Sequence, residues 1–431
     1  MTLGFNIYGT GLTRVMRTVM GLLSDRFEID FLGIGYREPV SECDGMRMHP
    51  TNMAGGGDVF GAFQVLEMAQ ENPPDVLFIL HDIWMFDYYT RVLAPLRPRT
   101  RLVAYIPLDG NIVDPSIALP LGGLDHVIVY THWAAEEVRR AFVQLVADGA
   151  PDTFPPVDVI YHGVETELFA PDPALQTAGF RREGRAGAKR DVFGAIDRVE
   201  ESFIILNAAR PAVRKRVDLT IDGFARFARN KPSNVKLCLH HAITEAETAD
   251  LLSLIDAFGI RDHVIYNPLS PDGGPLSEAD LARLYRACDV GINTAMGEGW
   301  GLVSFEHAST GAAQIIPNHT ACGALWDAQT AQMIEPVDWL VPEFSPLEMG
   351  LVDADSVAQA LETLYRDPVH LSRISAAGNT YVTQPDFRWE NIADQFAQVF
   401  ASHIPNVPNS PPQHRSNRHG SNNRGWTPGK I

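Results

Sequence analysis

Short β-rich runs alternate with runs of helical period along most of the chain, and this alternation restricts the fold more than any other feature. Strands that are separated by helices pair in parallel, and the helices then cover both faces of the sheet. The alternation extends from Leu3 to Tyr161, stops, and resumes at Phe203. The chain has 431 residues, more than one domain usually holds. The sequence therefore predicts an α/β protein of two parallel-sheet units, with a ligand cleft between them.

The change in composition at the break sets the predicted boundaries. Residues 1–170 form the first unit and residues 201–386 the second. Residues 171–200 include a glycine- and arginine-rich patch and are expected to be a linker that leads into the second unit. Residues 404–431 are rich in Pro, Asn, Ser, His and Arg and contain no Asp or Glu. This composition predicts a disordered tail.

Charge and cysteine content narrow the class of protein. A formal net charge of −18 repels nucleic acid at long range, so no nucleic-acid partner is expected. The four cysteines form no CxxC pair and no metal-ligand spacing, which favours reduced thiols in a reducing compartment. The first residues lack the basic and apolar regions of a signal peptide. We expect a cytoplasmic protein, and leave open a peripheral contact with the inner face of a membrane.

A glycine loop follows the first predicted strand, with Gly9 and Gly11 just before a predicted helix. Such a loop lets the backbone approach a ligand, and the helix start offers free N–H groups to an anion. The loop lacks the third glycine of a dinucleotide fingerprint. A tight strand-to-helix turn with no ligand explains the pattern equally well.

Four cations lie within seven residues where the first strand of the second unit ends: Arg210, Arg214, Lys215 and Arg216. Cations at a helix start oppose the helix dipole, so this placement is unfavourable unless an anion lies nearby. Arginine and lysine are the residues that bind phosphate. We favour a phosphate site over the alternative, a solvated basic turn.

The most informative segment lies between Asn293 and Gly311. A predicted strand enters a loop with glycines at 297, 299 and 301, and a helix follows. Its start can bind phosphate oxygens. Glu306 falls just over one turn into that helix, where a carboxylate can accept from two ribose hydroxyls. Glu298 precedes the helix, so it can reach another part of the ligand, such as a sugar.

This segment resembles the EGFGL…E signature of the family 4 (group 1) retaining glycosyltransferases, with Glu298 and Glu306 as the E-x7-E pair. Arg210 and Lys215 match the family's arginine and lysine, five residues apart, that bind the donor diphosphate. Other matches follow the family's order. They lie at Val159–Pro171, Leu281–Asp289 and Phe387–Glu390.

The resemblance implies the GT-B fold, in which two Rossmann-like domains face a central cleft. The second domain binds a nucleotide diphosphate sugar and the first binds the acceptor, while a last helix, expected over 387–403, returns to the first domain. The implied reaction is metal-independent transfer of a hexose-type sugar from a UDP- or GDP-linked donor to a glycan, lipid or protein, with no cofactor. The residues implied in donor binding are Gly9, Gly11, Arg210, Lys215, Gly299, Gly301, Leu302 and Glu306.

The implied catalytic set is Glu298, Arg210, Lys215 and Asp109. The chain departs from the family at Pro107–Gly110, where members often place a sugar-contacting histidine, and Asp109 is our own addition to the set. Asp109 is the candidate acceptor-side carboxylate, although a turn role in Asp-Gly explains it almost equally well. His81, which ends another predicted strand, is a candidate contact for the sugar or the acceptor.

The sequence leaves alternatives to a transferase open, and it also bears on a metal site. The same fold serves sugar-nucleotide epimerases and phosphorylases, and a non-catalytic module that binds nucleotide sugars is a third alternative. No metal triad is evident. Asp353-Ala-Asp355 has the DxD form, but it is remote from the other motifs, and we expect Asp355 to cap a helix.

Overall fold

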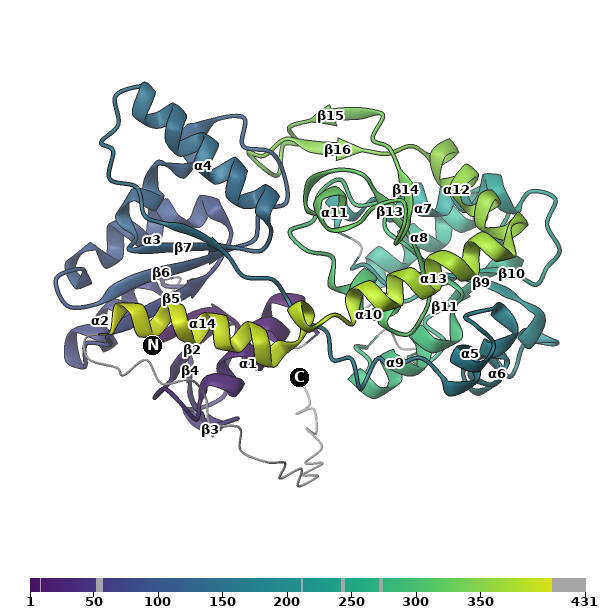
Figure 1. The fold of residues 1–431 in the computed structure, drawn as a ribbon, viewed down its shortest axis with the longest axis horizontal. Coiled ribbons are helices and arrows are strands. Elements are labelled where there is room, and N and C mark those ends of the chain that lie inside the picture. The colour runs from purple at the N-terminus through teal and green to yellow at the C-terminus, as the bar shows by residue number, and fades with distance from the viewer. Residues whose placement is uncertain (8, 52–56, 211, 242–244, 271–273, 405–431) are drawn as a thin grey trace.

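The computed structural model describes residues 1–7, 9–51, 57–210, 212–241, 245–270 and 274–404. Two lobes lie side by side, each built on its own large sheet (Figure 1). The predicted alternation of strands and helices is confirmed in both. Because helices cover both faces of each sheet, central strands such as Val76–Leu80 are buried along their whole length and read as unbroken apolar runs.

The sheet of the first lobe has eight strands in the order β3-β4-β2-β1-β5-β6-β7-β8. The β3–β4 pair is antiparallel and the other pairs are parallel. The elements are β1 (Thr2–Phe5), α1 (Gly11–Leu23), β2 (Asp30–Ile34), β3 (Ser41–Cys43), β4 (Met46–Pro50), α2 (Ala62–Glu71), β5 (Val76–Leu80), α3 (Phe86–Leu93), β6 (Arg101–Ile106), β7 (His126–Val129), α4 (His132–Ala147) and β8 (Val157–Val159).

The second lobe contains a parallel six-stranded sheet in the order β11-β10-β9-β12-β13-β14. Its elements are α5 (Pro173–Thr177), α6 (Ala186–Phe193), β9 (Phe203–Asn207), α7 (Val217–Ala228), β10 (Val235–Leu239), α8 (Glu245–Ala257), β11 (Val264–Tyr266), α9 (Glu278–Ala287), β12 (Val290–Ile292), α10 (Leu302–Ser309), β13 (Ala313–Pro317), α11 (Thr320–Leu325), β14 (Gln332–Ile334), β15 (Asp338–Leu340), β16 (Met349–Leu351), α12 (Ala354–Arg366) and α13 (Pro368–Val382).

The last described helix, α14 (Trp389–His403), leaves the second lobe and lies along the first (Figure 1, yellow). Its Phe396 ring packs edge-on against Phe78 and Tyr105, with ring centroids 5.5 and 4.9 Å apart. This is the return helix that was expected over residues 387–403. Of the predicted disordered tail, residues 405–431 lie outside the described part of the chain.

Residues 171–200, predicted as a linker, carry the helices α5 and α6. The ammonium of Lys189 in α6 is completely buried, and it lies 2.8 Å from Asp289 Oδ2 and 2.7 Å from the backbone oxygen of Ser202. Asp289 also accepts from the backbone N–H of Ile204 in β9, at 2.8 Å. The segment that joins the two lobes is therefore fastened to the second sheet.

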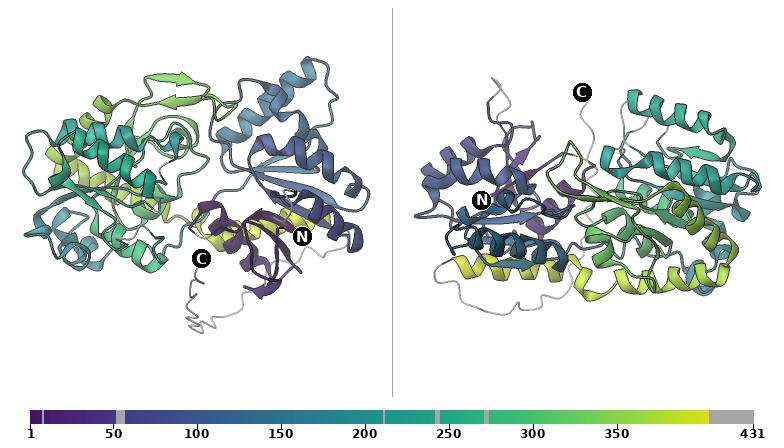
Figure 2. Two further views of the ribbon diagram at one scale, coloured as in Figure 1. Left: turned by 180° about the vertical axis from the view of Figure 1, so that it is seen from behind. Right: turned by 90° about the horizontal axis from the view of Figure 1, so that it is seen from above.

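A two-stranded hairpin, β15–β16, reaches from the second lobe toward the first (Figure 2). Just before β16, Glu348 and Asn111 of the first lobe exchange backbone hydrogen bonds of 2.8 and 3.0 Å. The amide of Asn111 also donates to Glu348 Oε2 at 3.1 Å. The hairpin thus adds a second link between the lobes besides the chain crossings.

Several helices begin where the sequence supplies a capping side chain, which satisfies an N–H group of the first turn. Thr131 caps α4, Ser277 caps α9 and Asp353 caps α12. The expectation that Asp355 is the cap is therefore wrong, because Asp355 already lies in the first turn and pairs with Arg226. Within the described residues, no helix has the length and apolar character that a bilayer-spanning segment needs.

Candidate functional site

Glu298 lies in the loop between β12 and α10, and is only 8% exposed. Its carboxylate forms an ion pair with Lys215, and Arg214 Nη1 lies 3.4 Å from Glu298 Oε2. Burial alone would raise the pKa of this carboxyl group, but the charges of Lys215 and Arg214 hold that pKa below its usual value. Burial also lowers the pKa of the Lys215 ammonium. Glu298 is therefore an ionised carboxylate held by two cations.

The loop that carries Glu298 is clamped between the lobes. Arg214 donates from Nη1 to the backbone oxygen of Gly297 at 2.8 Å, and Met296 donates its N–H to the backbone oxygen of Arg214 at 2.7 Å. On the other side, a Cβ at Gly297 would lie 1.8 Å from the backbone oxygen of Asp109, so only glycine fits there. Arg214 Nε lies 3.4 Å from Asp109 Oδ2. The carboxyl ends of β6, β9 and β12 therefore meet at Arg214.

The structure divides the cationic cluster. Lys215 and Arg214 reach Glu298, whereas Arg216 pairs with Asp218. Arg210 is exposed, and its guanidinium makes no hydrogen bond or ion pair with any residue in the described part of the chain. The sequence predicted Arg210 and Lys215 as the phosphate-binding pair. The structure brings Lys215 to Glu298, and the predicted phosphate-binding role of Arg210 stays a prediction.

Glu306 in α10 is buried and faces the first lobe. Its carboxylate forms an ion pair with Arg14 of α1, and Arg14 Nε lies 3.3 Å from Glu278 Oε1. Burial raises the pKa of the Glu306 carboxyl, and the charge of Arg14 offsets part of that rise. This ion pair joins the two lobes at the residue that the sequence predicted as the ribose contact.

The two predicted glycine loops also meet. A Cβ at Gly11 would lie 3.0 Å from Leu302 Cδ1, at the start of α10. Gly301 is the N-cap of α10 with a φ of 92°, and it supplies no side chain to cap the helix. The N–H groups at the start of α10 are therefore free of a side-chain cap and available to an anion. Gly9 lies against Pro275 on the second lobe, and Gly299 lies against Pro107 on the first.

Polar side chains follow β5, β6 and β7 at the same edge of the first sheet. Burial raises the pKa of Asp82 to about 7, with a further contribution from the charge of Asp109, while Arg214 lowers it. Asp109 Oδ1 is buried, and Tyr130, at 2% exposure, buries its hydroxyl; neither atom has a hydrogen-bond partner among the described residues. Asp109, predicted from the sequence, thus lies opposite Glu298 as part of a larger polar group.

His81 is buried among aromatic rings, with the centroid of Phe5 at 4.9 Å and that of Phe60 at 5.4 Å. Its Nδ1 accepts the N–H of Asp82 at 2.8 Å, so the proton lies on Nε2, which has no partner among the described residues. Burial lowers the pKa of His81 to about 4. His81 is a neutral, packed ring, and its predicted contact with the sugar or acceptor stays a prediction.

Sequence reasoning did not assign four members of this site: Arg14, Asp82, Tyr130 and Arg214. Asp82 and Tyr130 carry a signal that could have been used, because each directly follows or nearly follows a buried parallel strand, where α/β ligands bind. Arg214 lay inside the cationic cluster. Arg14 is a single arginine on an amphipathic helix, and nothing in the sequence marks it.

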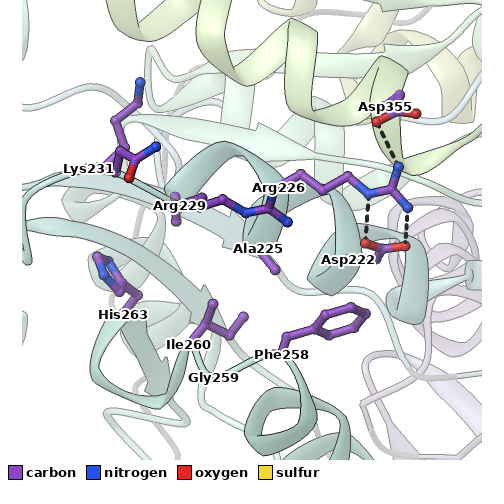
Figure 3. Close-up of a pocket in the computed structure, with 12 residues that line it drawn as sticks. Asp222, Ala225, Arg226, Arg229, Lys231, Phe258, Gly259, Ile260, His263 and Asp355 are labelled. Atoms are coloured by element: carbon purple, nitrogen blue, oxygen red, sulfur yellow. Dashed lines mark hydrogen bonds and ion pairs between the residues drawn. The ribbon is translucent and has the colours of Figure 1, made fainter.

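A cavity of about 720 Å³ lies elsewhere, between the end of α7 and the segment from Phe258 to His263 (Figure 3). Arg226 crosses it and pairs with Asp222 and Asp355 (Figure 3). Because α7 ends just before β10 begins, this cavity lies at the amino edge of the second sheet, opposite to the edge where α/β ligands bind. Within the described residues, no group of three or more His, Cys, Asp or Glu is placed to hold a metal ion.

No protein-family model matches the chain. By sequence, it is 24% identical over 251 residues to D-inositol 3-phosphate glycosyltransferase of an Arthrobacter species, a match that covers 56% of this chain and 48% of the relative. It is 28% identical over 127 residues to mannosylfructose-phosphate synthase of Agrobacterium fabrum, covering 28% and 26%. The chain thus spans about half the length of these curated relatives or less.

Solved structures match nearly the whole chain. The Anabaena protein HepE, in complex with UDP and glucose, has a TM-score of 0.66 at 15% identity and covers 93% of this chain and 98% of its own. Sucrose-phosphate synthase of Thermosynechococcus elongatus has a TM-score of 0.66 at 16% identity, with coverages of 93% and 95%. The fold is GT-B, as the motifs implied. The chain is a homologue of glycosyltransferases, and these relatives fit family 4.

Proposed function

We propose that the protein is a retaining glycosyltransferase that moves a hexose-type sugar from a UDP- or GDP-linked donor to a glycan, lipid or protein acceptor. One observation carries the proposal. Where the two lobes meet, the cations Lys215 and Arg214 hold the ionised Glu298 in the loop that leads to the uncapped start of α10. The relationship to glycosyltransferases supports the same conclusion.

The donor diphosphate would lie between Lys215 and the start of α10, beside Gly299, Gly301 and Leu302. Gly9 and Gly11 would close over it from the first lobe, with Arg210 at the outer side. Glu306 would accept hydrogen bonds from the two ribose hydroxyls, and for this it must exchange its contact with Arg14. In that arrangement the donor replaces an ion pair that already bridges the cleft.

The chemistry follows from where charge develops. As the anomeric C–O bond breaks, negative charge grows on the leaving diphosphate and positive charge on the sugar ring. Lys215 and the α10 N–H groups would stabilise the charge on the diphosphate, and Glu298 would contact the sugar. The acceptor oxygen attacks the anomeric carbon from the face that the diphosphate leaves, and its proton passes to a donor phosphate oxygen. Asp109 would hold the acceptor.

Nucleotide binding provides the first test. Thermal shift with UDP, GDP and ADP should single out one nucleotide, since a ligand at 100 times its Kd adds about 2.7 kcal/mol of stability. Lys215→Ala and Arg210→Ala should each weaken the shift. Arg226→Ala, on the far side of the second lobe, removes an equal charge and should leave the shift unchanged. Equal shifts in all four proteins would contradict the diphosphate assignment.

Turnover provides the second test and separates the alternatives. Release of the nucleotide from a sugar donor, dependent on an added acceptor, is expected for a transferase. An epimerase would convert the donor without any acceptor, and a phosphorylase would require inorganic phosphate. A binding module would give the thermal shift but no turnover. Where the acceptor is a lipid, flotation with vesicles that carry it would detect contact with a membrane surface.

A further inference from the structure

The first-lobe side of the contact between the lobes, where the proposed function places the acceptor, has a distinctive charge pattern. Two carboxyl groups, Asp82 and Asp109, follow the carboxyl ends of the neighbouring parallel strands β5 and β6, and the charge of Asp109 contributes to the raised pKa of Asp82. The carboxyl group of Asp82 makes no hydrogen bond to any residue in the described part of the chain, since the nearest ring nitrogen, His81 Nδ1, lies 3.9 Å away and carries no proton. Asp109 keeps one buried oxygen, Oδ1, that has no hydrogen-bond partner among the residues the structure describes.

A third group points to a ligand independently of the carboxylates. The hydroxyl of Tyr130, which follows the next strand, β7, is buried and has no hydrogen-bond partner among the described residues. The charge of Asp82 contributes to raising the pKa of that hydroxyl. A Cβ at Gly299 would lie 3.4 Å from Tyr130 Cδ2. A buried hydroxyl without a partner is unfavourable. The Tyr130 ring edge lies beside the Gly299 loop, and a ligand hydroxyl that reached the Tyr130 hydroxyl would relieve that cost.

The cations near these carboxylates come from the other lobe. The charge of Arg214 lowers the pKa of both Asp82 and Asp109, and the charge of Lys215 lowers the pKa of Asp109. Both cations are already engaged with Glu298 and belong to the donor side. Cations of the first lobe pair elsewhere: Arg14 with Glu306, Arg17 with Asp44, and Arg140 with Glu137.

This pattern discriminates between acceptors. A carboxyl group binds hydroxyl groups in either protonation state, because it accepts hydrogen bonds when ionised and also donates one when protonated. A phosphate ester would bring further negative charge beside Asp82 and Asp109, where the described cations that affect these carboxyl groups, Arg214 and Lys215, already pair with Glu298. Resting on the proposed function, we propose that the acceptor is an uncharged polyol, whose hydroxyls are held by Asp82 and Asp109, and that its phosphorylated counterparts are poor acceptors. Relatives named for inositol 3-phosphate would differ in this respect.

Matched pairs of acceptors test the proposal with the intact protein and the donor chosen by thermal shift. The pairs are glucose with glucose 6-phosphate, fructose with fructose 6-phosphate, and myo-inositol with inositol 3-phosphate. Nucleotide release and product mass are measured for each. We expect at least one neutral member to be used, with kcat/KM about tenfold or more above that of its phosphate ester.

Variants identify the residues responsible. Asp82→Asn and Asp109→Asn should each raise KM for the neutral polyol more than they lower kcat, and should narrow its advantage over the ester. Arg226→Ala should change neither. A phosphate ester that is used as well as its neutral partner would overturn the proposal, and so would an unchanged preference in both Asn variants.

The proposed function can fail separately. If no nucleotide gives a thermal shift and no donor is consumed, the transferase assignment itself is wrong. If a nucleotide binds and the donor is slowly hydrolysed, but no polyol of either kind accelerates its consumption or binds in calorimetry with the nucleotide present, the transferase assignment survives and the polyol proposal is wrong.

Discussion

Two lysine–carboxylate pairs of the second lobe differ in how completely the surrounding groups satisfy their hydrogen-bonding capacity. Lys189 and Asp289 are fully enclosed, and backbone groups of Ser202 and Ile204 complete their hydrogen bonding. Lys215 and Glu298 lie where the two lobes meet, and the neighbouring Asp109 retains an oxygen that has no partner in the described part of the chain. The first pair holds a segment to a sheet. The second leaves bonding capacity for a ligand.

Loss of the enclosed lysine should have the largest effect on folding. Lys189→Met removes the cation and leaves Asp289 as a buried unpaired charge, which costs about 3–5 kcal/mol. Urea titration of the variant should show this fall in the free energy of unfolding. A loss below about 1 kcal/mol would mean that the segment around α6 is not fastened to the second sheet by this pair.

The same substitution in the cleft should separate activity from stability. Lys215→Met leaves Glu298 with Arg214 as a partner, so its cost in unfolding free energy should be well below that of Lys189→Met. The turnover rate should instead fall by about 10²–10³, as for loss of one group that stabilises transition-state charge. Stability and rate are compared in one preparation. A variant that unfolds as readily as Lys189→Met would remove the distinction between the two pairs.

Asp82 should impose a pH dependence that an enclosed pair lacks. Its pKa is raised from 3.8 to about 7, so between these values the folded protein keeps a proton that the unfolded chain has released. Stability therefore falls as pH rises through that window. Asp82→Asn should remove this fall, and should be more stable than the parent by about 1–2 kcal/mol at pH 8, since partial exposure moderates the effect. Melting curves at pH 5 and pH 8 would reveal it, and parallel pH profiles would contradict it.

The smallest effect is expected at the surface. Arg226 pairs with Asp222 and Asp355, but all three groups are open to water, where ion pairs contribute little. Arg226→Ala should leave the melting temperature and the nucleotide-induced shift within experimental error of the parent. A clear change in the nucleotide shift would implicate the cavity of Figure 3 in ligand binding.

Much of the fold was predictable because long apolar runs and glycine loops are compatible with few secondary structures and few strand arrangements. The two parallel sheets, the loop before α10 and the placing of Glu298, Glu306 and Lys215 at the cleft follow from local patterns. Short polar strands such as β3 and β4 do not, since their pairing rather than their composition makes them strands.

The cross-cleft partners escaped prediction for a different reason. Which cation of the cluster faces Glu298 depends on the backbone at Arg216, whose φ of 48° turns the chain between Lys215 and α7. The pairing of Arg14 with Glu306 joins residues 292 positions apart, and only the packing of the two lobes brings them together. Patterns within one sequence carry no information on such distances.

The bridge between Asn111 and Glu348 has a consequence for how this protein can vary. Its two main bonds run through main-chain atoms, which every residue except proline supplies in full. Substitutions at both positions can therefore accumulate over evolutionary time while these two backbone hydrogen bonds are kept. Proline at either position is the exception, because it would remove one of the two N–H donors and with it one of the two backbone hydrogen bonds between the lobes.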